Sequence, residues 1–91
     1  MARVIVTMRI MPAGVDVDFA AIEKKASLLI AEFGGNVAKS EQVPVAFGLK
    51  SLNLMFIMNE DIGSTETLEE DIKKIKGVES VEVIDVRRAV G

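Results

Sequence analysis

Few side chains in this sequence could carry out chemistry, because it contains neither cysteine nor histidine. The chain therefore lacks a thiol nucleophile, the commonest general base and the commonest metal ligand. Two carboxylate pairs remain as candidates for acid–base work, Asp16 with Asp18 and Glu69 with Glu70. We interpret the first pair as helix caps and the second as a solvated helix face. These residues predict a protein that is not an enzyme and that uses no metal and no cofactor.

Two other features could bind a partner. The apolar segment 44–48 has Phe47 near its tip, and the cations Arg87 and Arg88 follow the last predicted strand. Phe47 either packs back onto the sheet or projects as an aromatic contact for a partner. The arginines are either a solvated tail or mobile cations that enter an acidic or phosphate-bearing site of a partner. The sequence alone leaves both choices open.

The composition excludes several partner classes. The net charge is −3 and the pI is near 4.9, whereas nucleic-acid binders usually have a basic excess. Tryptophan and tyrosine are absent, so few aromatic rings could stack on bases. Glycine-rich nucleotide-binding loops and apolar runs long enough to cross a bilayer are also absent from the sequence. We expect a cytoplasmic protein without direct nucleic-acid or membrane contact.

Six segments have the hydrophobic patterns of strands and helices. Strands are predicted at residues 3–11, 36–43, 49–58 and 78–86, the second of them a charged edge strand. An amphipathic helix is predicted from a cap at Asp16 or Asp18 to residue 33. A second helix is predicted from a cap at Ser64, Thr65 or Thr67, through Leu68, Ile72 and Ile75, to Gly77.

This βαββαβ order predicts one α+β domain over residues 1–91, a ferredoxin-like sandwich. Its four-stranded antiparallel sheet would have two helices on one face. Alternation along the strands predicts which residues face the helices: Val4, Val6, Met8, Ile10, Leu52, Leu54, Phe56 and Met58. The other face would be open, with Ile5, Thr7, Ser51, Asn53 and Met55 on it.

Segment 43–54, VPVAFGLKSLNL, resembles the P-[IV]-x-[FY]-G-[IL]-x-x-L core of the translation elongation factor 1-beta family. Segment 63–70, GSTETLEE, is similar to the family's entry into its second helix. VESVEV at 78–83, followed by DVRR at 85–88, is similar to its last strand and tail. VIVTMRIMP at 4–12 resembles the archaeal members. The resemblance covers essentially the whole chain, in order.

The resemblance implies a guanine nucleotide exchange factor for elongation factor 1-alpha, of the archaeal stand-alone type and monomeric when free. It implies that Phe47, with Ala46, Gly48 and Lys50 beside it, contacts the GTPase. A cation near the C-terminus, Arg88 or Arg87, would then disturb the Mg²⁺ site of the GTPase. Eukaryotic members have lysine at that position, and arginine has a wider, planar head.

Two alternative functions belong to other classes. The first is a small regulatory ligand-binding module that forms a homodimer through its open sheet face, on which Ile5, Met55 and Ile57 are apolar. The second, weaker alternative is an acylphosphatase-like hydrolase using Arg9 and Asn53, although no phosphate-binding loop accompanies these residues.

Overall fold

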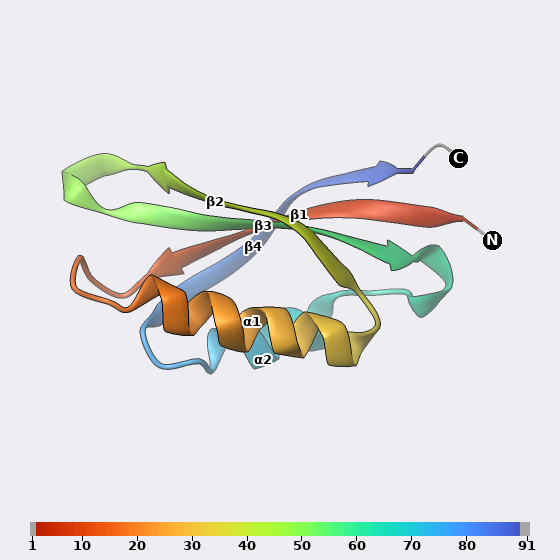
Figure 1. Cartoon of the computed structure of the whole chain (residues 1–91), viewed down its shortest axis with the longest axis horizontal. Coiled ribbons are helices and arrows are strands. Elements are labelled where there is room, and N and C mark those ends of the chain that lie inside the picture. The colour runs from red at the N-terminus through yellow and green to blue at the C-terminus, as the bar shows by residue number, and fades with distance from the viewer. Residues whose placement is uncertain (1, 90–91) are drawn as a thin grey trace.

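The chain folds into two layers, a sheet and a pair of helices on one of its faces (Figure 1). The computed structural model describes residues 2–89. The strands are β1 (Arg3–Pro12), β2 (Asn36–Pro44), β3 (Lys50–Asn59) and β4 (Val78–Arg88); the helices are α1 (Phe19–Phe33) and α2 (Glu66–Lys73). The strand order is β2-β3-β1-β4, with all neighbours antiparallel. The predicted ferredoxin-like sandwich is confirmed.

The core lies between the helices and the two central strands. β1 and β3 pair so that Val6 lies opposite Phe56 and Met8 lies opposite Leu54. These residues are buried together with one side of each helix: Ile22, Ala26, Ile30, Leu68 and Ile72. The apolar face that alternation predicted for both strands is therefore the buried face, and β2 is an edge strand, as its charges indicated.

Helix α1 begins and ends where the sequence provides caps. Of the two candidate caps it is Asp18 that acts, because its Oδ1 accepts a hydrogen bond of 3.2 Å from the Ala21 N–H. At the other end Gly34 has a φ of 110°, and its N–H donates to Ile30 O and Ala31 O. A residue with a Cβ rarely adopts that conformation, so glycine is the natural residue for this helix end.

Replacing Asp18 by alanine is expected to lower the free energy of unfolding by about 1 kcal/mol, because a first-turn N–H loses its acceptor. Urea unfolding followed by circular dichroism measures this loss. Asp16→Ala is the matched control, since Asp18 and not Asp16 provides the cap bond, and we expect it to leave the midpoint unchanged. Equal losses in the two variants would contradict the assignment of the cap.

Helix α2 is shorter than predicted. It ends at Lys73 rather than near Gly77, and Ile75, predicted as part of its apolar face, follows the helix. The backbone after α2 forms hydrogen bonds of the 3₁₀ type: the Lys74 N–H donates to Asp71 O at 3.2 Å, and the Ile75 N–H donates to Ile72 O at 3.0 Å. Ile75 still packs against the core from this turn. At the other end of α2, Ser64 Oγ accepts from the Glu66 N–H, whereas Thr65 Oγ1 donates to Glu69 Oε2.

The last strand is longer than predicted. β4 continues through Arg88, which lies opposite Val4 of β1, and the Ala89 N–H donates to Arg3 O at 2.8 Å. The two arginines are therefore part of the sheet and not of a solvated tail. The sandwich measures 41 × 21 × 18 Å, with the β2–β3 hairpin at one end of the long axis and both termini at the other (Figure 1).

Candidate partner-binding surfaces

The β2–β3 hairpin ends in a tight turn, η1 (Ala46–Gly48), that exposes an aromatic ring. The Val45 N–H donates to Leu49 O at 2.8 Å and the Leu49 N–H donates to Ala46 O at 3.2 Å, which closes the turn. Phe47 is 96% exposed at its tip, with φ 60° and ψ 34°. Of the two alternatives for this side chain, the projecting one is correct.

The backbone of Phe47 is unusual for a bulky residue. Among residues 2–89 it is the only non-glycine residue with a positive φ. The left-handed conformation costs a side-chain-bearing residue roughly 1–2 kcal/mol. Glycine would relieve this cost, so a solvent-exposed phenylalanine here has no explanation in the stability of the free protein. Strain of this kind persists where the surrounding structure holds a residue for another purpose.

The neighbours of Phe47 form one exposed segment with it. Ala46, Gly48 and Lys50 are all exposed. Lys50 pairs with Pro44, and this pair is the one next to the turn of the hairpin. A Cβ added at Gly48 would meet nothing within 4 Å. The structure therefore brings together four predicted partner-binding residues in one apolar segment with a single cation. We call Ala46, Phe47, Gly48 and Lys50 the hairpin tip.

Arg87 and Arg88 lie on opposite faces of the sheet. Arg87 is opposite Ile5 on the open face, whereas Arg88 is opposite Val4, whose face is covered by the helices. Arg87 Nε donates to Asp85 Oδ2 of the same strand at 2.9 Å. Arg88 Nη2 donates to both carboxylate oxygens of Glu60, at 2.8 and 3.0 Å. The two side chains therefore leave β4 on opposite faces of the sheet and pair with different carboxylates.

The β2–β3 hairpin and the C-terminal end of β4 lie at opposite ends of the molecule (Figure 1), and Arg88 is the last residue of β4. Strand β3 runs from Lys50, in the hairpin tip, to Asn59, next to Glu60. A strand of that length spans about 30 Å at the usual rise per residue. The sequence-predicted site is therefore two separate surfaces, and a partner that contacts both must extend along most of the sandwich.

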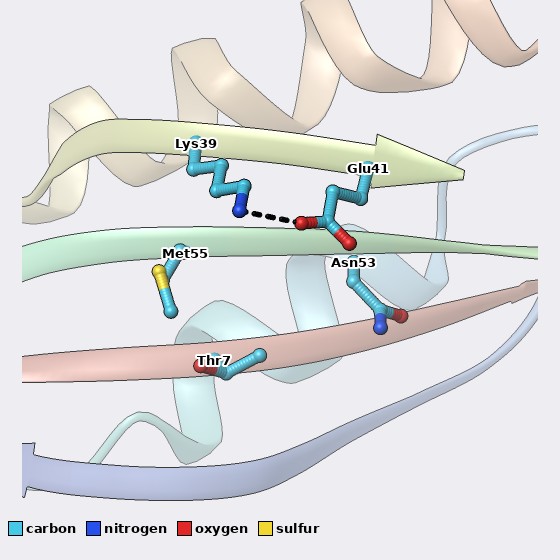
Figure 2. Close-up of a pocket in the computed structure, with 5 residues that line it drawn as sticks. All are labelled: Thr7, Lys39, Glu41, Asn53 and Met55. Carbon is cyan, nitrogen blue, oxygen red and sulfur yellow. Dashed lines mark ion pairs between the residues drawn. The ribbon is translucent and has the colours of Figure 1, made fainter. Parts of the chain in front are cut away.

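A small hollow on the open face of the sheet is lined mostly by polar side chains (Figure 2). Lys39 and Glu41 of β2 form an ion pair of 2.7 Å beside Asn53, Met55 and Thr7. The hydrogen bond from Lys39 to Glu41, and the negative charge of that carboxylate, raise the pKa of Lys39. The hollow between these five side chains measures about 110 Å³, whereas pockets for small ligands usually measure about 300–1,000 Å³.

Ser51 does not belong to this open surface, contrary to the sequence prediction, because it is fully buried. Its Oγ donates to Asn53 Oδ1 at 3.2 Å, so the hydroxyl is satisfied. Burying this small side chain on a central strand costs little free energy, because its hydroxyl keeps a hydrogen-bond partner.

A second hollow, of about 380 Å³, lies beside the N-terminus of α1. Two carboxylates and two ammonium groups line it, those of Asp16, Asp18, Lys25 and Lys76, so it favours neither sign of ligand charge. Asp18 is already engaged as the helix cap. Within residues 2–89, no group of three or more His, Cys, Asp or Glu side chains could hold a metal ion. No helix in this part of the chain is long and apolar enough to cross a membrane.

Residue 60 was not singled out from the sequence as a functional position. Glu60 lies 28 residues before Arg88, and the pairing of β3 and β4 with β1 brings the two side chains together. Only the strand register could have revealed this contact, because neither residue has a local motif that points to the other.

Solved structures of similar shape share the sandwich. The ACT domain of a GTP pyrophosphokinase from Chlorobium tepidum matches with a TM-score of 0.59 and 23% identity, over 88% of this chain and 96% of that one. At that identity the likeness shows the fold alone.

Sequence comparisons identify the family. Residues 5–89 match the family model of the EF-1 guanine nucleotide exchange domain. Elongation factor 1-beta of Methanothermobacter thermautotrophicus is 41% identical over 88 residues, which cover 97% of this chain and 98% of that protein. Elongation factor 1-beta of Aeropyrum pernix is 39% identical over 97% of this chain and 98% of its own length. The chain therefore belongs to the family of EF-1 guanine nucleotide exchange domains.

Proposed function

We propose that this chain is a guanine nucleotide exchange factor for elongation factor 1-alpha, the GTPase that its family name implies. The observation that carries the proposal is Phe47, 96% exposed on a left-handed backbone at the end of a hairpin. An aromatic side chain held in water at a conformational cost gains its stabilisation when a partner buries it. Membership of the EF-1 guanine nucleotide exchange family supports elongation factor 1-alpha as that partner.

The proposed mechanism divides the work between the two ends of the sandwich. The hairpin tip binds the GTPase, and Arg88 at the other end approaches the Mg²⁺ and phosphate site of the GTPase. A guanidinium there repels Mg²⁺ and attracts the carboxylates around it, so GDP is held less tightly. Because coupling between sites is reciprocal, the exchange factor then binds the nucleotide-free GTPase more tightly than the loaded one.

The environments of the two arginines support Arg88 over Arg87 for this role. Each arginine forms one ion pair, Arg87 with Asp85 and Arg88 with Glu60, so pairing does not separate them; Arg87 lies on the open face. Arg88 lies on the other face, two residues from Val86, which is 58% exposed. An exposed apolar side chain next to a cation suits a protein partner, because the two provide contact area and charge together.

The test is release of a fluorescent GDP analogue from elongation factor 1-alpha of the same source, with excess unlabelled nucleotide and increasing amounts of this protein. We expect release to accelerate and to saturate as the protein concentration rises. Unchanged release in the presence of folded protein would overturn the proposal. A dimer whose association responds to a small metabolite would then favour the ligand-binding module.

A further inference from the structure

The ion pair between Arg88 and Glu60 joins two elements that are not neighbours in the sheet. Glu60 begins the short turn η2 (Glu60–Ile62) directly after β3, and Arg88 is the last residue of β4. β1 lies between these strands, so their backbones are roughly 9–10 Å apart. The two long side chains therefore reach across the start of β1 to meet.

Both ends of this contact are held by backbone hydrogen bonds to the same segment. The Glu60 N–H donates to Ala2 O at 3.0 Å, and the Ala89 N–H, one residue after Arg88, donates to Arg3 O at 2.8 Å. The carboxylate and the guanidinium thus start from backbones fixed relative to each other. An ion pair between side chains on fixed backbones restricts those side chains more than an ion pair between two mobile segments would.

Among the side-chain contacts within residues 2–89, the Arg88 guanidinium donates through one nitrogen, Nη2. Glu60 Oε1 and Oε2 both accept from Nη2, at 2.8 and 3.0 Å. Within residues 2–89, Nε and Nη1 of Arg88 donate to no side chain. An arginine has several N–H donors in a fixed planar fork, so a carboxylate at one corner leaves the others available. Glu60 therefore orients the head without occupying all of its donors.

We infer that Glu60 is a positioning residue for Arg88 in nucleotide exchange; this inference rests on the proposed function. Arginine loses side-chain entropy when its long, flexible side chain is ordered. Because Glu60 already restricts the Arg88 guanidinium in the free protein, less side-chain entropy is lost when Arg88 enters the site on the GTPase. Glu60 does not itself contact nucleotide or Mg²⁺ in this scheme.

Glu60→Ala is expected to lower the maximal rate of GDP release roughly threefold to fivefold, because an exposed ion pair contributes at most about 1 kcal/mol. The concentration for half-maximal acceleration should change less than twofold, since the hairpin tip is intact. Glu60→Gln keeps an oxygen that can accept from Nη2 and should restore part of the rate. Glu82→Ala is the matched control, because Glu82 forms an exposed ion pair with Arg9 elsewhere on the sheet.

A double-mutant cycle separates positioning from a general structural effect. If Glu60 acts through Arg88, Glu60→Ala has no further effect in the Arg88→Ala background. A second readout needs no GTPase: NMR relaxation of the Arg88 guanidinium in the free protein should show greater mobility in Glu60→Ala than in Glu82→Ala. Thermal unfolding identifies any variant that has lost its fold.

The outcomes distinguish this inference from the proposed function. Wild-type rates in Glu60→Ala, or equal losses with and without Arg88, would overturn the positioning role while exchange activity stands. A faster rate in Glu60→Ala would also overturn it, since Glu60 would then be restraining Arg88. If the wild-type protein fails to accelerate release at all, both the function and the positioning role are wrong, whatever the relaxation data show.

Discussion

Phe47→Ala is expected to raise the concentration for half-maximal exchange roughly 30-fold, which corresponds to about 2 kcal/mol of binding free energy. The ring is 96% exposed in the free protein, so its entire surface is available for burial in a partner. The maximal rate at saturating protein should stay near the wild-type value, because Arg88 is untouched. A titration of exchange rate against protein concentration measures both quantities.

Stability provides the check on this variant. Phe47 makes little contact with its own chain, so Phe47→Ala should unfold within about 0.5 kcal/mol of wild type. Leu28→Ala is the matched control, because Leu28 is an apolar side chain 57% exposed on α1, away from the hairpin tip. It should leave both exchange parameters unchanged. Wild-type half-maximal concentration in Phe47→Ala would contradict a binding role for the ring.

Arg88→Ala is expected to have the opposite kinetic signature, with a maximal release rate reduced roughly 30- to 150-fold, or about 2–3 kcal/mol. This loss is larger than that of the exposed Glu60 pair, because the guanidinium would act in a site from which the GTPase excludes water. The half-maximal concentration should change little, since the hairpin tip remains. Stopped-flow release at saturating protein measures the effect.

Two further variants make the Arg88 result specific. Arg87→Ala tests the neighbouring cation, and a larger loss there than in Arg88→Ala would assign the role to Arg87. Arg9→Ala removes an exposed, ion-paired arginine of the open face and should leave the rate unchanged. If Arg88→Ala releases GDP at the wild-type rate, the proposed effect of the cation on the Mg²⁺ site is wrong.

The architecture was largely predictable because its patterns are local. Alternation in β1 and β3 identified the buried face, and the spacing in α1 with the glycine at its end identified the helix. The errors came where tertiary contacts outweigh local pattern. β4 extends to Arg88 because β1 offers backbone partners there, and α2 ends early because the chain must turn back to reach β4.

The candidate site was predictable in its residues but not in its arrangement. The sequence indicated Phe47 and the arginine pair by type and position. It left open whether the ring projects, which depends on the left-handed backbone of one residue. It could not separate Arg87 from Arg88, because the predicted strand ended at residue 86, and their opposite directions follow from the continuation of β4 through both residues. It also missed Glu60, whose contact with Arg88 exists only in the folded sheet.

The two ends of β3 have a consequence for the order of events on the GTPase. In the proposed mechanism, docking of the hairpin tip delivers Arg88 as if at high local concentration, because a continuous sheet and not a flexible linker joins the two surfaces. The distance between the hairpin tip and Arg88 is fixed by the sheet. A GTPase that changes the distance between its two contact points can therefore bind the hairpin tip and Arg88 together in only some of its conformations. If both surfaces bind as proposed, the length of β3 determines which conformation of the GTPase this protein recognises.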